Sequence, residues 1–159
     1  MSDAIREAIR RAAEANGIDP ATALAYAERE STFNPRARNS KTIRGLFQMK
    51  GDLRAKYGIG DSDDVDTQVR GFGGLLNDNK AAMKKRLGRD VTDAEAYAGH
   101  HFGAGRGARM FGMDPETPVD QVFTRDEMSQ NPHFARAGTV GRLLGDVTGD
   151  IENRRTKWG

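Results

Sequence analysis

One glutamate in the first third of the chain occupies an unusual position, which a catalytic role would explain. Glu30 closes a helical run rich in Ala, Leu and Tyr, and polar residues follow at once. The C-terminal end of a helix disfavours an ionised carboxylate because the helix dipole is negative there. The apolar turn before it, with Tyr26 and Ala27, disfavours the charge as well because it removes water. A carboxyl group that keeps its proton can act as a general acid, so Glu30 is a candidate catalytic residue.

Three arginines close to Glu30 in the sequence act in the opposite direction. Arg29, Arg36 and Arg38 would favour the ionised carboxylate if they contact it. The sequence leaves this balance open. A glutamate at a helix end is, by itself, an ordinary exposed residue that pairs with an arginine. The surrounding residues therefore decide how Glu30 is interpreted.

Helices must position Glu30, and the first two are marked clearly. Apolar residues recur at helical spacing over residues 5–13, and Asn16-Gly17 ends that pattern. Asp19-Pro20 then supplies an N-cap and a first-turn proline for a second helix. This second helix is expected to run to about Glu30 or Thr32. It should end before Asn34-Pro35, because the residue before a proline avoids helical geometry.

The middle of the chain predicts a loop followed by further helices. Residues 34–43 are basic and polar, and a helical pattern resumes over residues 43–57. A long helix is expected over residues 66–87. Glycines inside it lower its propensity but would let another element approach closely. Its expected buried side consists of Val69, Phe72, Leu75, Leu76 and Met83.

Two capping boxes mark helix starts in the second half. Thr92 with Glu95 opens a helix expected to reach about Phe102, and Thr124 with Glu127 opens a short segment. Leu143 and Leu144 suit a last short helix. The basic residues after it, Arg154, Arg155 and Lys157, are expected to be solvated.

The whole pattern predicts a mainly α fold of roughly six to eight helices in one domain. That domain is expected to cover residues 1–148, with a C-terminal tail or linker at 149–159. No alternating apolar pattern indicates a strand. The length of 159 residues suits one ordinary domain.

Composition excludes several classes of function. The 25 Lys and Arg residues nearly balance the 23 Asp and Glu residues, which argues against a nucleic-acid-binding stripe. The absence of cysteine excludes disulfides and thiolate chemistry. No stretch approaches the ~18 apolar residues of a membrane span, and the N-terminal residues carry no signal-peptide pattern.

A two-part motif surrounds Glu30. Its first part is Glu30-Ser31 with Phe33-Asn34-Pro35, and its second part is Gly45-Leu46-Phe47-Gln48-Met49. This pattern resembles the soluble lytic transglycosylase family, whose members are relatives of goose-type lysozyme and cleave peptidoglycan. The spacing from Glu30 to Gln48 matches the family without a gap. The resemblance covers about residues 15–112 and implies a lysozyme-like domain with Glu30 as the catalytic residue.

The resemblance also implies a reaction. A lytic transglycosylase cleaves the β-1,4 bond between MurNAc and GlcNAc in peptidoglycan glycan strands, and one glutamate acts as acid and then as base. The acetamido group of the substrate takes the place of a second carboxylate, and the 6-hydroxyl closes a 1,6-anhydro ring. Neither a metal nor a cofactor is implied. The substrate-binding candidates in this part of the chain are Ser31, Asn39, Gln48 and Met49.

A weaker likeness continues in "AYAGHHFGAGRG", residues 96–107, where most members read Ala-Tyr-Asn-Ala-Gly-x-Gly. Alignment on the glycines places His100 where the family's tyrosine contacts the catalytic glutamate and His101 on the asparagine. Alignment on Ala96-Tyr97 keeps the tyrosine instead. We favour His100 as the residue that steadies Glu30, with Tyr97 second. All three are candidate substrate-binding residues.

The two histidines make the chain look like a phage-type variant of the family. This interpretation implies a phage virion, or the host periplasm and cell wall, as the place of action. The expected partners are peptidoglycan strands and, within a virion, other phage proteins. Nucleic acid is not an expected partner.

Three alternatives differ from this interpretation in chemistry. A hydrolysing goose-type lysozyme would need a second carboxylate roughly 6.5–9.5 Å from the first, and the candidates are Asp61, Asp63, Asp64 and Asp66. A non-catalytic module would keep the fold and only bind glycan. A metal site at His100-His101 is disfavoured because adjacent helical residues point in different directions and no third ligand is clustered nearby.

Overall fold

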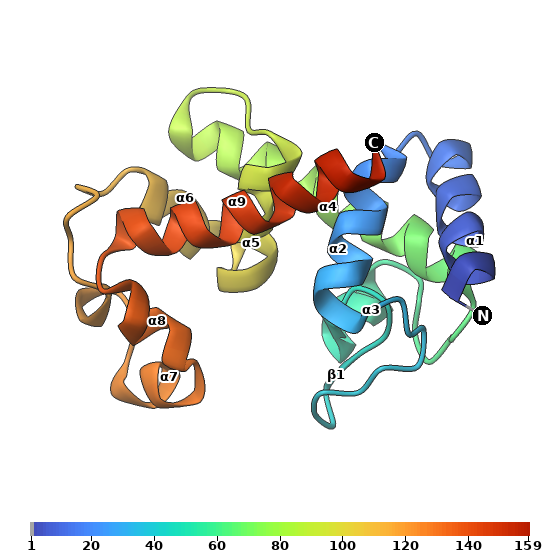
Figure 1. Ribbon diagram of the computed structural model, residues 1–159, viewed down its shortest axis with the longest axis horizontal. Coiled ribbons are helices and arrows are strands. Elements are labelled where there is room, and N and C mark those ends of the chain that lie inside the picture. Colours follow the sequence, from blue (N-terminus) through green and yellow to red (C-terminus); the bar gives the residue numbers. More distant parts are fainter. Residues whose placement is uncertain (1) are drawn as a thin grey trace. The chain divides into compact units, whose positions relative to one another are not determined.

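The computed structural model describes residues 2–159, and these are mainly helical (Figure 1). The prediction of a mainly α fold is confirmed, and the described residues form nine α-helices, which exceeds the expected number. The helices are α1 (Ser2–Ala15), α2 (Pro20–Ser31), α3 (Gly51–Lys56), α4 (Val65–Leu87), α5 (Asp93–Phe102), α6 (Ala104–Phe111), α7 (Arg125–Gln130), α8 (Pro132–Ala137) and α9 (Val140–Trp158). A 3-10 turn, η1 (Val119–Gln121), and two short strands, β1 (Ile43–Arg44) and β2 (Met49–Lys50), complete the fold.

The chain divides into two compact units. Unit 1 contains the residues up to Asp78 together with Ile151–Gly159, and unit 2 contains Asn79–Asp150. Helices α4 and α9 therefore each supply residues to both units. Residues 149–158, which the sequence analysis placed in a tail or linker, are part of α9.

Helices α1 and α2 pack against each other in unit 1, as Figure 1 shows. The expected caps of α2 are present: the Asp19 carboxylate accepts a hydrogen bond from the Ala21 amide over 3.0 Å, and Pro20 occupies the first turn. The link between α1 and α2 also contacts α4. A Cβ built on Gly73 would lie 2.5 Å from Ile18, so the glycine permits the close approach that the sequence analysis expected.

The prediction of a helix over residues 43–57 is wrong for its first half. Residues 43–50 form an antiparallel hairpin in which Ile43 pairs with Lys50 and Arg44 with Met49, and the helix α3 begins only at Gly51. Positive φ angles at Gly45 (90°) and Gln48 (48°) reverse the chain between the strands. Apolar spacing resembled a helix because the pairing of two-residue strands leaves no alternating pattern to read.

Helix α4 agrees with the prediction over almost its whole length. It begins at Val65, one residue before the expected start, and ends at Leu87. The five residues expected on its buried side are all buried in the structure: Val69, Phe72, Leu75, Leu76 and Met83.

Unit 2 is built around α5 and α6, which pack closely together. Both expected capping boxes are present, at Thr92 with Glu95 and at Thr124 with Glu127. An aromatic cluster fills the core beside them. Its members are Phe102, Phe123 and Phe134, whose ring centroids lie 4.4–5.6 Å apart.

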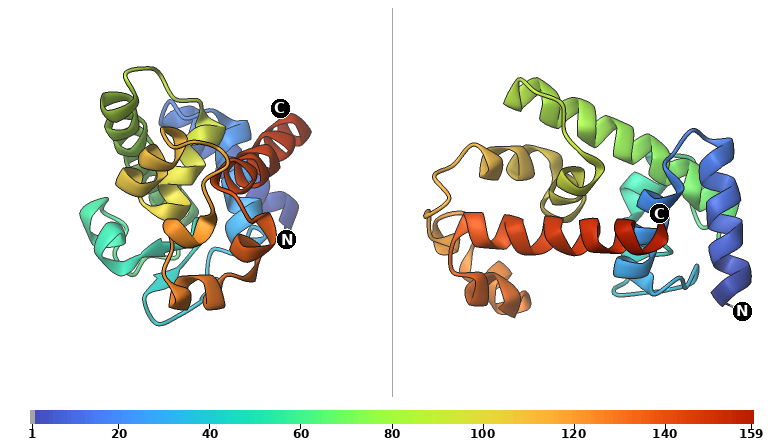
Figure 2. Two further views of the ribbon diagram at one scale, coloured as in Figure 1. Left: turned by 90° about the vertical axis from the view of Figure 1, so that its left-hand side faces the viewer. Right: turned by 45° about the horizontal axis from the view of Figure 1, so that its top comes forward.

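The last helix is much longer than the short one predicted around Leu143 and Leu144. Helix α9 has 19 residues, and Figure 2 shows it as one continuous helix. The basic residues expected to be solvated make ion pairs instead. Arg154 and Lys157 contact Glu28, and Arg155 contacts Asp19. Within residues 2–159, no helix combines the length and the apolar character that crossing a membrane requires.

Candidate active site

Glu30 lies in the last turn of α2 and is half-buried. The helix ends at Ser31 because Thr32 and Phe33 adopt positive φ angles of 50° and 64°. Their amides bond back to the last turn, from Thr32 to the Glu28 carbonyl (3.0 Å) and from Phe33 to the Ala27 carbonyl (3.3 Å). A threonine and a phenylalanine at positive φ carry backbone strain, so surrounding contacts must hold this end of the helix. The helix thus stops before Asn34-Pro35, which the sequence analysis expected to end it.

Phe33 supplies part of that support. Its side chain is 5% exposed, and its ring meets the Trp158 ring edge-on at 5.6 Å. The Arg6 guanidinium lies over the Phe33 ring at 5.5 Å. Phe33 therefore fills the core of unit 1 and anchors the strained turn that follows Glu30.

Three aromatic side chains in contact with one another also support α2 near its end. Tyr26, one turn before Glu30, contacts Phe72 of α4 with ring centroids 4.9 Å apart. Phe47, in the second part of the motif, stacks on the same Phe72 ring at 4.1 Å and 7°. One residue of α4 therefore fixes both α2 and the hairpin turn.

A buried amide joins the two parts of the motif. Gln68 of α4 is 1% exposed; its nitrogen donates to the Pro35 carbonyl (3.1 Å) and its oxygen accepts from the Leu46 amide (2.8 Å). Pro35 belongs to the first part of the motif and Leu46 to the second. A buried amide with both ends bonded holds its partners in one geometry. The sequence analysis gave Gln68 no role, since nothing in its local pattern reveals partners this far away.

The substrate-binding candidates of unit 1 differ in how exposed their side chains are and in which of their atoms are free to bind a ligand. The Ser31 hydroxyl donates to the Ala27 carbonyl within α2 over 2.9 Å. The Gln48 amide nitrogen donates to the carbonyls of Ala37 (3.2 Å) and Gly45 (2.9 Å), which leaves its oxygen as the atom able to meet a ligand. Asn39 is exposed on the loop. Met49 is 2% exposed and packs inside unit 1, so it supports the site from beneath.

The remaining candidates lie together on α5 in unit 2. Tyr97 is 1% exposed, and its ring stacks on His100 (5.9 Å, 18°) and on His101 (5.5 Å, 15°). His101 also meets Phe134 edge-on at 6.2 Å. Glu30 belongs to unit 1, so a contact between Glu30 and His100 or Tyr97 stays a prediction.

These elements coincide with a known domain. A model of the Transglycosylase SLT domain matches residues 7–106, which include both parts of the motif and the whole of α5. The chain belongs to the SLT domain family. It is also 27% identical, over 115 residues, to the membrane-bound lytic murein transglycosylase F of Shewanella frigidimarina (strain NCIMB 400). That match covers 66% of this chain and spans only 23% of the relative's length.

Three of the four aspartates considered as a second carboxylate make contacts of their own in this SLT domain. Asp64 caps α4: its carboxylate accepts hydrogen bonds from the Thr67 amide (2.9 Å) and hydroxyl (2.8 Å), which lower the pKa of Asp64. Asp61 pairs with Arg44 at 3.3 Å, and Asp63 pairs with Arg36 at 3.5 Å. Asp66 lies exposed in the first turn of α4.

The sequence analysis missed one further residue of this SLT domain, Arg54. Its side chain is 2% exposed and donates to the carbonyls of Arg44 (3.2 Å), Gly60 (2.8 Å) and Ser62 (2.7 Å). Burial, together with the charge of Arg44, lowers its pKa. The available signal was that Arg54 occupies a position of α3 that is buried in the fold. Among the described residues, no group of three or more His, Asp or Glu side chains is placed to hold a metal ion.

Proposed function

We propose that the chain is a peptidoglycan lytic transglycosylase and that Glu30 is its catalytic acid and base. One observation carries this proposal: Glu30 lies in the last turn of α2, just before a strained turn, and the buried Gln68 ties the segment after it to the Gly45–Met49 segment. A catalytic carboxyl group must be held within a narrow range of positions relative to the scissile bond. The family membership and the name of the Shewanella relative, a lytic murein transglycosylase, support the same reaction.

In the first step Glu30 gives its proton to the glycosidic oxygen between MurNAc and GlcNAc. The bond from that oxygen to the anomeric carbon breaks, and the acetamido oxygen of the same sugar bonds to the carbon as positive charge develops. The substrate therefore supplies the group that a second carboxylate supplies in most glycosidases. The GlcNAc leaves with the transferred proton.

In the second step the ionised Glu30 takes the proton of the 6-hydroxyl. The 6-oxygen then bonds to the anomeric carbon, and the acetamido oxygen is released. The product is a 1,6-anhydro ring, no water is consumed, and Glu30 is protonated again.

The other candidates take supporting roles in this proposal. The Gln48 oxygen and the Asn39 side chain face ligand hydroxyl or amide groups, and Ser31 keeps the last turn of α2 closed. The role proposed for His100 is to steady Glu30. The setting proposed from the two histidines is a phage virion, or the host periplasm and cell wall.

A digest of purified peptidoglycan tests the function. Wild type, Glu30→Gln and the matched control Glu14→Gln, an exposed glutamate of α1, are compared, and the products are measured by mass spectrometry. Wild type and Glu14→Gln should release 1,6-anhydro products, which are one water lighter than hydrolysis products, while Glu30→Gln releases none.

Each other outcome contradicts a defined part of the proposal. Ordinary reducing ends would make the chain a hydrolase and direct attention to the aspartates at 61–66. Cleavage by Glu30→Gln close to wild type would remove Glu30 from the mechanism. Glycan binding without products would leave a binding module.

A further inference from the structure

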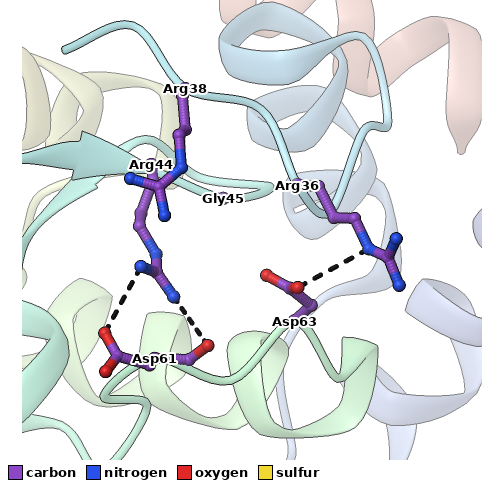
Figure 3. A pocket seen from close by; sticks show the side chains of 6 residues that line it. All are labelled: Arg36, Arg38, Arg44, Gly45, Asp61 and Asp63. Carbon is purple, nitrogen blue, oxygen red and sulfur yellow. Dashed lines mark hydrogen bonds and ion pairs between the residues drawn. The ribbon is translucent and has the colours of Figure 1, made fainter. Parts of the chain in front are cut away.

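A charged pocket of about 400 Å³ lies in unit 1 and is distinct from the Glu30 turn. Its lining consists of Arg36, Arg38, Arg44, Gly45, Asp61 and Asp63. In Figure 3, Arg38 and Arg44 line one side with Asp61, and Arg36 lies across from them with Asp63. Nothing in the proposed cleavage reaction uses these side chains.

The charges of the pocket lining are unbalanced. Three guanidinium groups face two carboxylates, which gives a formal charge of +1. Arg44 pairs with Asp61 and Arg36 with Asp63, and among the lining residues Arg38 is the arginine that neither aspartate contacts (Figure 3). Buried Arg54 lies behind this group, and the charges of Arg44 and Arg38 both act on it. A single negative charge on a ligand would balance the lining.

The ion pairs already present are weak enough to exchange. Their nitrogen–oxygen distances are 3.3 Å and 3.5 Å, longer than the 2.7–2.9 Å typical of strong charge-assisted hydrogen bonds. Each pair has one well exposed member, since the Asp61 side chain is 100% exposed and that of Arg36 is 80% exposed. The Arg44 side chain is only 17% exposed, and a 2.6 Å hydrogen bond to the Asp61 backbone carbonyl keeps it in place when the carboxylate moves away. Exposed ion pairs of this kind contribute little to stability. A ligand carboxylate can therefore replace an aspartate on its guanidinium group without disturbing the fold.

The walls of the pocket are held in place from behind. Arg54 donates to the carbonyl of Arg44 and to the carbonyls of Gly60 and Ser62, which flank Asp61 on the same side of the pocket. One buried side chain thus fixes the backbone around Arg44 relative to the backbone around Asp61. A preformed pocket avoids the ordering cost that a flexible loop would incur on binding.

We propose that this pocket binds a carboxylate of the peptide stem attached to the glycan strand. The inference rests on the proposed function, because that function makes a peptide-bearing glycan the substrate. The pocket is joined to the motif by sequence: Gly45 lines it and opens the Gly45–Met49 segment, and Arg36 and Arg38 lie on the loop after Glu30. A stem bound there would hold its sugar beside the same loop.

The lining favours a carboxylate over a phosphate. The Arg44–Asp61 and Arg36–Asp63 pairs show that these guanidinium groups can pair with a carboxylate in this geometry. A phosphate carries up to two negative charges, which exceed the +1 of the lining and would lie against the two aspartates. A guanidinium group bonds a carboxylate through two parallel N–H groups, so Arg38 and Arg44 can select its planar shape.

Binding is tested first without catalysis, in the Glu30→Gln chain. The probes are a synthetic stem pentapeptide with free carboxylates, the same peptide with every carboxylate amidated, and inorganic phosphate, each titrated by calorimetry. Arg38→Gln and Arg44→Gln are added separately to this chain. Arg70→Gln is the matched control, because Arg70 is an exposed arginine of α4 that does not line the pocket.

The free-carboxylate peptide should bind, and the amidated peptide should not. Each pocket substitution should weaken binding by about tenfold or more, as expected for a lost charge-assisted hydrogen bond, while Arg70→Gln leaves binding unchanged. Equal binding of both peptides, binding of phosphate alone, or no binding of any probe would overturn the inference.

A second comparison separates this inference from the proposed function. Otherwise wild-type chains carrying the same substitutions are assayed on glycan strands with stems and on strands stripped of stems. Arg38→Gln should raise KM for stem-bearing strands, so that the variant has the same KM for stem-bearing and stripped strands. Cleavage of stripped strands without peptide binding would refute only the pocket, and peptide binding without cleavage of either substrate would refute only the function.

Discussion

Arg154 donates a hydrogen bond of 2.6 Å to the carboxylate of Glu28, although 126 residues separate the two along the chain. Lys157 donates to the other oxygen of the same carboxylate over 2.8 Å. The Glu28 side chain is 12% exposed, so its charge depends on these two partners. Since Glu28 lies two residues before Glu30, the end of α9 braces the part of α2 that carries the catalytic candidate.

Glu28→Gln should therefore lower the free energy of unfolding by roughly 1.5–3 kcal/mol near neutral pH, the range for hydrogen bonds to charged groups. Urea titration of the variant and wild type measures the change. Glu14→Gln on α1 serves as the control and should change the free energy of unfolding by less than about 0.5 kcal/mol. A Glu28 variant as stable as this control would mean that the α9 contacts do not support α2.

The carboxylate of Glu28 also makes the stability of the fold depend on pH. Burial raises the pKa of Glu28, but the hydrogen bonds from Lys157 and Arg154 outweigh burial and hold it below the ordinary value. A lowered pKa stabilises the fold above the unfolded pKa, about 4.3, and this stabilisation is lost as the pH falls through the folded pKa. The stability difference between wild type and Glu28→Gln should therefore shrink below about pH 4 in urea titrations. A constant difference down to pH 2 would contradict this assignment.

Tyr57 gives the opposite pH dependence. Burial, together with a 2.5 Å hydrogen bond to Asp78, raises its pKa to about 12. A raised pKa stabilises the fold below the unfolded value, about 10, and the stabilisation is lost as the pH rises through the folded value. Tyr57→Phe should cost about 1 kcal/mol at pH 7, and the difference from wild type should narrow above pH 10. Urea titrations of both proteins at pH 8 and pH 11 measure this stability difference. A larger difference at pH 11 than at pH 8 would contradict the role of the hydrogen bond.

Gly45 should tolerate no side chain. Its φ is +90°, and a Cβ there would lie 2.4 Å from both the Arg54 guanidinium and the Gln68 amide oxygen. Gly45→Ala should lower the free energy of unfolding by about 2–4 kcal/mol, because backbone strain adds to the displacement of two buried side chains. Gly58→Ala is the matched control: its φ is +75°, and its Cβ would meet nothing within 4 Å. Equal losses in the two variants would show that strain alone matters.

His100→Ala should reduce kcat for glycan cleavage by about 10- to 100-fold, the cost of a misplaced catalytic group. Tyr97→Phe should have a smaller effect. The phenylalanine keeps the buried ring that stacks on both histidines, whereas alanine would leave a cavity. Both variants are assayed on peptidoglycan after circular dichroism shows intact helices. A larger loss for Tyr97→Phe would mean that the tyrosine, and not His100, steadies Glu30.

Local signals predicted the helices that carry the site. The Asp19-Pro20 start of α2 and the capping box at Thr92 act within a few residues, so they can be read directly. The hairpin at 43–50 was predicted as helix because its strands are too short to show alternation. Helix α9 was predicted as short, around Leu143 and Leu144, because its later residues are held by distant partners such as Glu28.

The supporting contacts of the candidate site could not be predicted from sequence for the same reason. Glu30 and Gln48 stand in a recognisable motif, whereas Gln68 and Arg54 act through hydrogen bonds to backbone carbonyls, which every residue possesses. A polar residue at a buried helical position is the trace that such contacts leave. Sequence alone does not say which carbonyls it meets.

The division of unit 1 between residues up to Asp78 and Ile151–Gly159 has a consequence for synthesis. A ribosome releases all of unit 2 before it releases the segment that supplies Arg154, Lys157 and Trp158. During that interval Glu28 lacks its two cations and Phe33 lacks the ring it packs against. Within unit 1, the end of α2 therefore gains these supporting contacts only after translation has passed α9, and Glu30 is braced no earlier.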